Sequence, residues 1–97
     1  MNGIMILFRM PAKTPSRTVN KFCKEFYGQD TSSHRGTYRY HRHGLLDDFP
    51  HHRIIRQVVI VKTEDAKKVV EFLESYDATI HIRVVELTSE DIEMLFE

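Results

Sequence analysis

The residues best suited to chemistry are concentrated in residues 34–56 (HRGTYRYHRHGLLDDFPHHRIIR). This stretch holds five of the six histidines and five arginines, against two acids, Asp47 and Asp48. Guanidinium groups bind phosphates, tyrosine rings stack on bases, and imidazole and carboxylate groups bind transition metals. The stretch therefore has to be considered for nucleic-acid binding, metal binding and acid–base catalysis.

Nucleic-acid binding is the first of these possibilities. Tyr38 and Tyr40 alternate with Arg39 and His41, a pattern typical of a β-strand with two different faces. If the tyrosines pack toward the core, the arginine and histidine point to solvent, because turning the arginine inward would bury a charge. We predict a nucleic-acid surface made by Tyr38, Arg39, Tyr40, His41, Arg42, Arg53, Arg56, His81 and Arg83. The pI of about 7.0 argues against a dedicated nucleic-acid binder, and a solvated sheet face is the alternative.

A metal site is the second possibility. The candidate ligands are His41, His43, Asp47, Asp48, His51 and His52. Imidazole and carboxylate suit Zn²⁺ or a similar divalent ion, but the stretch has neither the helical HxxxH nor the CxxC spacing of dedicated sites. Two adjacent histidines in a strand also point to opposite sides. We therefore expect no cofactor, with a divalent metal as the alternative.

Catalysis is the third possibility. Asp47 and Asp48, close to histidines, could transfer protons or hold a divalent ion for phosphodiester cleavage. An acidic turn before Pro50 explains the same residues more simply. Cys23 falls on the apolar stripe of a predicted helix, so we interpret it as a core residue and not as a nucleophile. We expect a binding or assembly protein, with a metal-dependent nuclease as an alternative.

The elements that must position these residues follow from hydrophobic periodicity. Strands are predicted over residues 4–10, 37–42, 54–62 and 79–87. Three helices are predicted from their start and stop signals. The first begins at Thr14–Pro15 and ends at Gly28, the second begins at Thr63, and the third begins at Thr88 with Asp91 as its capping partner. Residues 29–36 are polar and are predicted to form a loop.

The predicted fold class is α+β, a ferredoxin-like βαββαβ sandwich forming a single domain over residues 1–97. It has a four-stranded antiparallel sheet with two helices on one face and a short C-terminal helix. Ile80, Ile82 and Val84 are predicted to face the helices. The open face is then expected to carry Arg39, His41, Gln57, His81 and Arg83.

Composition restricts the partners and the location. No apolar run approaches the roughly 20 residues of a membrane span, no signal peptide is recognised at the N-terminus, and a single cysteine fits a reducing compartment. We therefore predict a cytoplasmic protein that does not contact membranes. Residues 1–57 carry ten Lys+Arg and four Asp+Glu, and residues 58–97 carry four and ten. This asymmetry suggests either an anionic partner such as RNA or DNA, or a homodimer that joins basic to acidic surfaces.

The element order, the small size and the segment SRTVNKFCKEFYG after the first strand resemble the small ferredoxin-like subunit of CRISPR adaptation complexes. That resemblance implies a small dimer that supports spacer integration, and in some members a metal-dependent nuclease. The first strand of that family usually ends in an aspartate offered as a metal ligand. The corresponding region here is Phe8-Arg9-Met10, so the resemblance transfers no catalytic residue.

Overall fold

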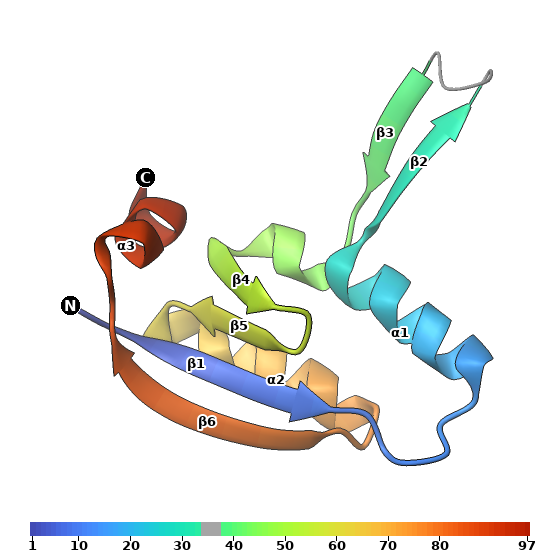
Figure 1. Ribbon diagram of the computed structural model, residues 1–97, viewed down its shortest axis with the longest axis horizontal. Helices are drawn as coiled ribbons and strands as arrows, with labels where there is room; N and C mark the ends of the chain where they lie inside the picture. Colours follow the sequence, from blue (N-terminus) through green and yellow to red (C-terminus); the bar gives the residue numbers. More distant parts are fainter. Residues whose placement is uncertain (34–37) are drawn as a thin grey trace. The chain divides into compact units, whose positions relative to one another are not determined.

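The computed structural model describes residues 1–33 and 38–97, and the side chains of these residues except Ser32, Ser33, Tyr38 and Arg39. In chain order the elements are β1 (Asn2–Arg9), α1 (Ser16–Tyr27), β2 (Gln29–Ser33), β3 (Tyr38–Arg42), the 3₁₀ turn η1 (Leu45–Asp48), β4 (His51–Ile55), β5 (Val58–Val61), the 3₁₀ turn η2 (Thr63–Asp65), α2 (Ala66–Ser75), β6 (Thr79–Glu86) and α3 (Ser89–Phe96) (Figure 1). They form two compact units. We call residues 1–13 and 49–97 the sheet unit, and residues 14–48 the ribbon unit.

The sheet unit contains a four-stranded antiparallel sheet in the order β4-β5-β1-β6. The predicted α+β class and the four-stranded antiparallel sheet are therefore confirmed. The element order differs from the prediction, because two further strands, β2 and β3, lie between α1 and β4 and form a sheet of their own. The single strand predicted over residues 54–62 is in fact a hairpin, in which β4 and β5 are joined at Arg56 and Gln57.

Alternation along β1 divides the sheet into two faces. Ile4, Ile6 and Phe8 are buried on one face, as expected for the side covered by a helix. α2 contacts β1 and β6, and its Val69 and Leu73 are fully buried. The first face and α2 therefore make the main core of the sheet unit.

The opposite face has a second, smaller core. Ile60, Leu87 and Leu95 are buried there, and Met5, Val85 and Ile92 pack against them. Leu95 and Ile92 belong to α3, which also contacts β4. α3 thus covers one end of the sheet face that α2 leaves open.

Strand β6 corrects the prediction that Ile82 and Val84 are buried. Their side chains are 45% and 69% exposed. Both lie on an edge strand, which has a neighbouring strand on one side only, within the part of the chain that the structure describes. Apolar side chains at an edge are less enclosed than the same residue types on a central strand.

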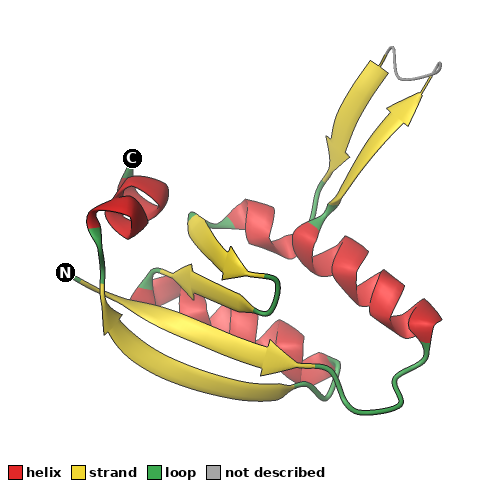
Figure 2. Cartoon of the chain, in the orientation of Figure 1, coloured by secondary structure: helices red, strands yellow, loops and turns green. Residues whose placement is uncertain are grey.

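The ribbon unit consists of α1, β2, β3 and η1. Phe22 and Phe26 are the buried residues of α1, and their rings stack with centroids 5.2 Å apart. The predicted stop at Gly28 is confirmed, since this residue has a φ of 81° and ends the helix. β2 and β3 then pair antiparallel as a two-stranded ribbon (Figure 2). Part of the predicted loop over residues 29–36 is therefore a strand, and the rest of it, residues 34–36, lies outside the described residues.

None of the helices in the described part of the chain combines the length and apolar character that crossing a bilayer requires.

Candidate functional site

The base of the ribbon is held by a histidine between two carboxylates. His41 on β3 has its Nδ1 2.7 Å from Asp30 Oδ1 on β2 and its Nε2 2.7 Å from Asp47 Oδ2 on η1. Asp47 Oδ2 also accepts a hydrogen bond of 2.7 Å from the Gly44 amide. Three consecutive elements, β2, β3 and η1, are thus tied together through one imidazole ring. We call Asp30, His41 and Asp47 the ribbon clamp.

The ring of His41 can donate hydrogen bonds to both ionised carboxylates of the clamp only when it is protonated. A neutral imidazole has one N–H donor and one acceptor nitrogen, whereas both ring nitrogens here face carboxylate oxygens. The hydrogen bond to Asp30, followed by that to Asp47, raises the pKa of His41. Burial alone would raise the pKa of Asp47, but the Gly44 amide and the His41 ring lower it below its ordinary value. While His41 is protonated, both ring nitrogens donate to carboxylates and neither has a lone pair available to a proton or a metal.

Two glycines allow this arrangement. A Cβ added to Gly28 would approach the Arg42 carbonyl and the His41 ring, and one added to Gly44 would approach the Gly28 backbone. The chain therefore enters the ribbon at Gly28 and leaves it at Gly44 with the two backbones in contact. A larger residue at either position would separate the ribbon from the end of α1.

Beside the clamp, β3 presents side chains to solvent. Tyr40 is 50% exposed, so the prediction that this tyrosine packs inward is wrong. None of the described residues of β2 and β3 is buried. The hydrogen bond with Thr31, and then Arg42, lowers the pKa of Tyr40. His43 Nε2 lies 2.7 Å from Asp48 Oδ1, so a second histidine also has a carboxylate partner in η1. The predicted orientations of Tyr38 and Arg39 fall outside the described side chains.

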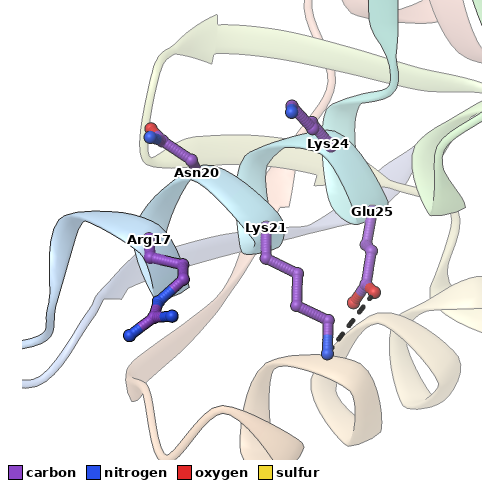
Figure 3. Close-up of a pocket in the computed structure, with 5 residues that line it drawn as sticks. All are labelled: Arg17, Asn20, Lys21, Lys24 and Glu25. Atoms are coloured by element: carbon purple, nitrogen blue, oxygen red, sulfur yellow. Dashed lines mark ion pairs between the residues drawn. The ribbon is translucent and has the colours of Figure 1, made fainter.

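The polar face of α1 adds cations to the same unit. Its exposed side chains line a pocket, shown in Figure 3, made by Arg17, Asn20, Lys21, Lys24 and Glu25. Their spacing of three and four residues places them on one side of the helix, away from Phe22 and Phe26. Lys21 pairs with Glu25 at 4.0 Å. The face is therefore predominantly basic, with one carboxylate.

The remaining predicted nucleic-acid residues lie in the sheet unit. His81 and Arg83 are exposed on β6, Arg53 is exposed on β4, and Arg56 is exposed at the turn after β4. The prediction that His81 and Arg83 share one sheet face with Arg39 and His41 is wrong. It placed β3 in the large sheet, whereas β3 pairs only with β2 in the described structure.

The candidate metal ligands have other partners. The described residues contain no group of three or more His, Cys, Asp or Glu side chains that could hold a metal ion. His51 Nδ1 lies 2.9 Å from the Phe49 carbonyl. His52 Nδ1 lies 2.7 Å from Asp91 Oδ1 and its Nε2 lies 3.5 Å from Glu90 Oε1, both on α3.

Asp30, Asp91 and the basic face of α1 were not predicted as site residues. Asp30 and Asp91 find their histidine partners 11 and 39 residues away, and sequence spacing gives no signal for such pairs. The i, i+3 and i+4 spacing of the α1 cations is visible in the sequence and could have identified that face. No family model, curated protein or solved structure matches the chain.

Proposed function

We propose that the ribbon unit binds nucleic acid through β3 and the basic face of α1. The observation that supports this most directly is an exposed aromatic and cationic pair, Tyr40 and Arg42, on a ribbon whose base is fixed by the clamp. A two-stranded ribbon fits the major groove of a duplex, and an exposed tyrosine can stack on an unpaired base. Holding the ribbon in place before binding reduces the entropy lost on association.

Charge distribution supports the same unit. Residues 14–48 contain six Lys+Arg and four Asp+Glu, whereas the sheet unit contains eight and ten. Two of the four acids, Asp30 and Asp47, contact His41, which when protonated offsets one of their two negative charges and so reduces their repulsion of a phosphate. The ribbon unit is therefore the more cationic part of the chain, in which Arg17, Lys21 and Lys24 supply the phosphate contacts.

The test compares two lysines in similar surroundings. Lys21 pairs with Glu25, and Lys67 on α2 pairs with Glu71, both at i, i+4 and 4.0 Å. We expect Lys21→Gln to weaken binding of a labelled duplex, measured by fluorescence anisotropy, and to reduce the slope of log K against log salt by about 1. Lys67→Gln should leave both unchanged. Equal effects of the two substitutions, or no binding at low salt, would contradict the proposal.

A second set of variants tests the ribbon itself. Tyr40→Ala should weaken binding to a labelled single strand by roughly tenfold, since one stacked base is lost, while Tyr40→Phe should retain most of the affinity. Arg39→Ala should also weaken binding, because β3 carries this residue. Unchanged affinity in Tyr40→Ala would remove stacking from the proposal.

Homodimerisation is the second candidate function, and β6 favours it. An eight-residue edge strand with Ile82 and Val84 exposed has unpaired backbone groups and apolar side chains that a second copy could cover. Sedimentation at micromolar concentration tests this directly, and a monomer would contradict it.

We also propose that the chain has a ferredoxin-like fold. With β2 and β3 set aside, the chain runs strand, helix, strand, strand, helix, strand, the order that suggested a ferredoxin-like domain and the resemblance to the CRISPR adaptation subunit. We treat the ribbon as an insertion into that order and the protein as cytoplasmic, since its single cysteine, Cys23, leaves no disulfide to form within the chain. An experimental structure in which α1 and α2 do not share one face of the sheet would contradict the ferredoxin-like assignment.

A further inference from the structure

A small pocket in the sheet unit is lined by residues that the proposed nucleic-acid surface does not use. It is lined by Leu7, Phe8, Arg9, Thr79 and His81, at the end of β1 and the beginning of β6, and has a volume of about 220 Å³. Pockets for drug-sized ligands usually exceed roughly 300 Å³, so this one suits a small ion or the end of a larger ligand.

Strand register brings three donor groups together at this pocket. Leu7 is paired with His81, and Arg9 is paired with Thr79. Paired residues of an antiparallel ladder project from the same face, with directly opposite Cβ atoms about 5 Å apart and diagonal neighbours about 7–8 Å apart. Arg9, Thr79 and His81 therefore occupy one face within reach of a common ligand. This is the same face that α3 covers at its other end, where Met5 and Val85 pack.

The chemistry of the pocket is that of an anion site. Arg9 offers a planar set of N–H donors, Thr79 a hydroxyl and His81 a ring N–H. None of the five described lining residues carries a carboxylate, and Arg83 lies two residues along β6 on the same face, where it adds positive potential. The carboxylate nearest along the chain is Asp77, in the turn before β6.

We propose that Arg9, Thr79 and His81 bind an oxyanion, specifically a phosphate group. A phosphate group presents more acceptor oxygens than a carboxylate and arranges them tetrahedrally, so the guanidinium, hydroxyl and imidazole donors can each reach an oxygen from a different direction. The phosphate could belong to a small phosphate ester or to a nucleic-acid backbone. Both sources require the same three side chains.

The test is an NMR titration of the full chain with inorganic phosphate. We expect saturable shifts of backbone amides in residues 7–9 and 79–81. Arg9→Gln and His81→Gln should each weaken the affinity by roughly tenfold, since each removes a donor to the anion. Lys67→Gln removes the same charge from the same unit outside the pocket and should leave the affinity unchanged. Two variants are used so that a folding defect in one, visible in its spectrum, does not decide the result.

The proposal is overturned if phosphate gives no saturable shift at these amides, or if Arg9→Gln and His81→Gln titrate like the natural chain. Repeating the titration with a nucleoside monophosphate and with a short duplex identifies the source. Tighter binding of the monophosphate supports a small ester, and competition by the duplex supports a backbone phosphate. The site does not depend on the ribbon unit, so Lys21→Gln should leave the phosphate titration intact even where it abolishes duplex binding.

Discussion

Substitution of Asp91 by alanine should reveal how much the attachment of α3 contributes to the stability of the sheet unit. Asp91 is 5% exposed, and each of its carboxylate oxygens has a partner. Oδ1 lies 2.7 Å from His52 Nδ1 on β4, and Oδ2 accepts a 2.9 Å hydrogen bond from the Thr88 amide. In return, the Asp91 amide donates to the Thr88 hydroxyl at 3.2 Å, which completes a capping box. One side chain thus both starts α3 and ties it to the sheet.

The magnitude follows from these two roles. Asp91→Ala removes the carboxylate half of the capping box, which costs up to about 1 kcal/mol because the Thr88 hydroxyl still caps the helix, and leaving a buried hydrogen-bonding group without its partner costs about 1–3 kcal/mol. The side chain of His52 is 15% exposed, so solvent compensates it only in part. We expect Asp91→Ala to lower the free energy of unfolding by about 2–3 kcal/mol. Each kcal/mol corresponds to about 4–8 °C in Tm for a domain of this size.

The assay is urea denaturation of the natural chain, Asp91→Ala, His52→Ala and the double variant. A coupling energy of about 1 kcal/mol or more between the two positions is expected for groups in direct contact. Glu90→Ala is the control, because Glu90 lies 3.5 Å from His52 and its side chain is 76% exposed. Such exposed pairs contribute less than about 1 kcal/mol.

Lowering the pH should remove the contribution of Asp91 to the free energy of unfolding. The Thr88 amide lowers the pKa of Asp91, burial opposes this, and His52 lowers it further. A carboxylate with a lowered pKa stabilises the fold above its unfolded-state value and loses that contribution as the pH falls through the folded value. The difference in the free energy of unfolding between the natural chain and Asp91→Asn should therefore become smaller below about pH 4. A coupling energy near zero, or a difference independent of pH, would refute the account of α3.

Three further outcomes are expected. Asp30, followed by Asp47, raises the pKa of His41, so both hydrogen bonds of the clamp should be present below about pH 6.5 and lost as the pH rises through the raised value. The loss should appear as broadened signals of the β3 amides in NMR spectra. Signals that do not change with pH would contradict this. Gly28→Ala should destabilise the ribbon unit by at least about 1 kcal/mol in denaturation, since φ is 81° and a Cβ would meet the Arg42 carbonyl; unchanged stability would contradict the close approach. If β6 joins two copies, Val84→Lys should give a monomer in sedimentation, and an unchanged mass would exclude this strand from the interface.

The parts of the fold that local sequence determines could be predicted. The capping box between Thr88 and Asp91 and the stop at Gly28 depend on a few adjacent residues, and both are confirmed. The apolar stripe of α1 was also visible, because Phe22 and Phe26 recur at helical spacing. In each case one segment contains the whole signal.

The parts that failed depend on contacts with distant residues or lack a hydrophobic signal. The sequence of β2, QDTSS, has neither apolar alternation nor β-branched residues apart from Thr31, so a polar ribbon looks like a loop. The turn at Arg56 and Gln57 has no Gly, Pro or Asn, so β4 and β5 looked like one strand. The clamp could not be foreseen because it requires β2, β3 and η1 to be placed first.

Because Gly28 and Gly44 are in contact, the segment between them leaves the rest of the chain and returns to it at one point. A chain segment whose two ends are in contact can change in length or composition without moving the residues on either side of it. The entropic cost of closing such a segment grows only slowly with its length. We therefore expect evolution to change the length or charge of this segment to suit different partners while the rest of the chain stays constant. Related chains, wherever they occur, should differ most in the number of residues between these two glycines.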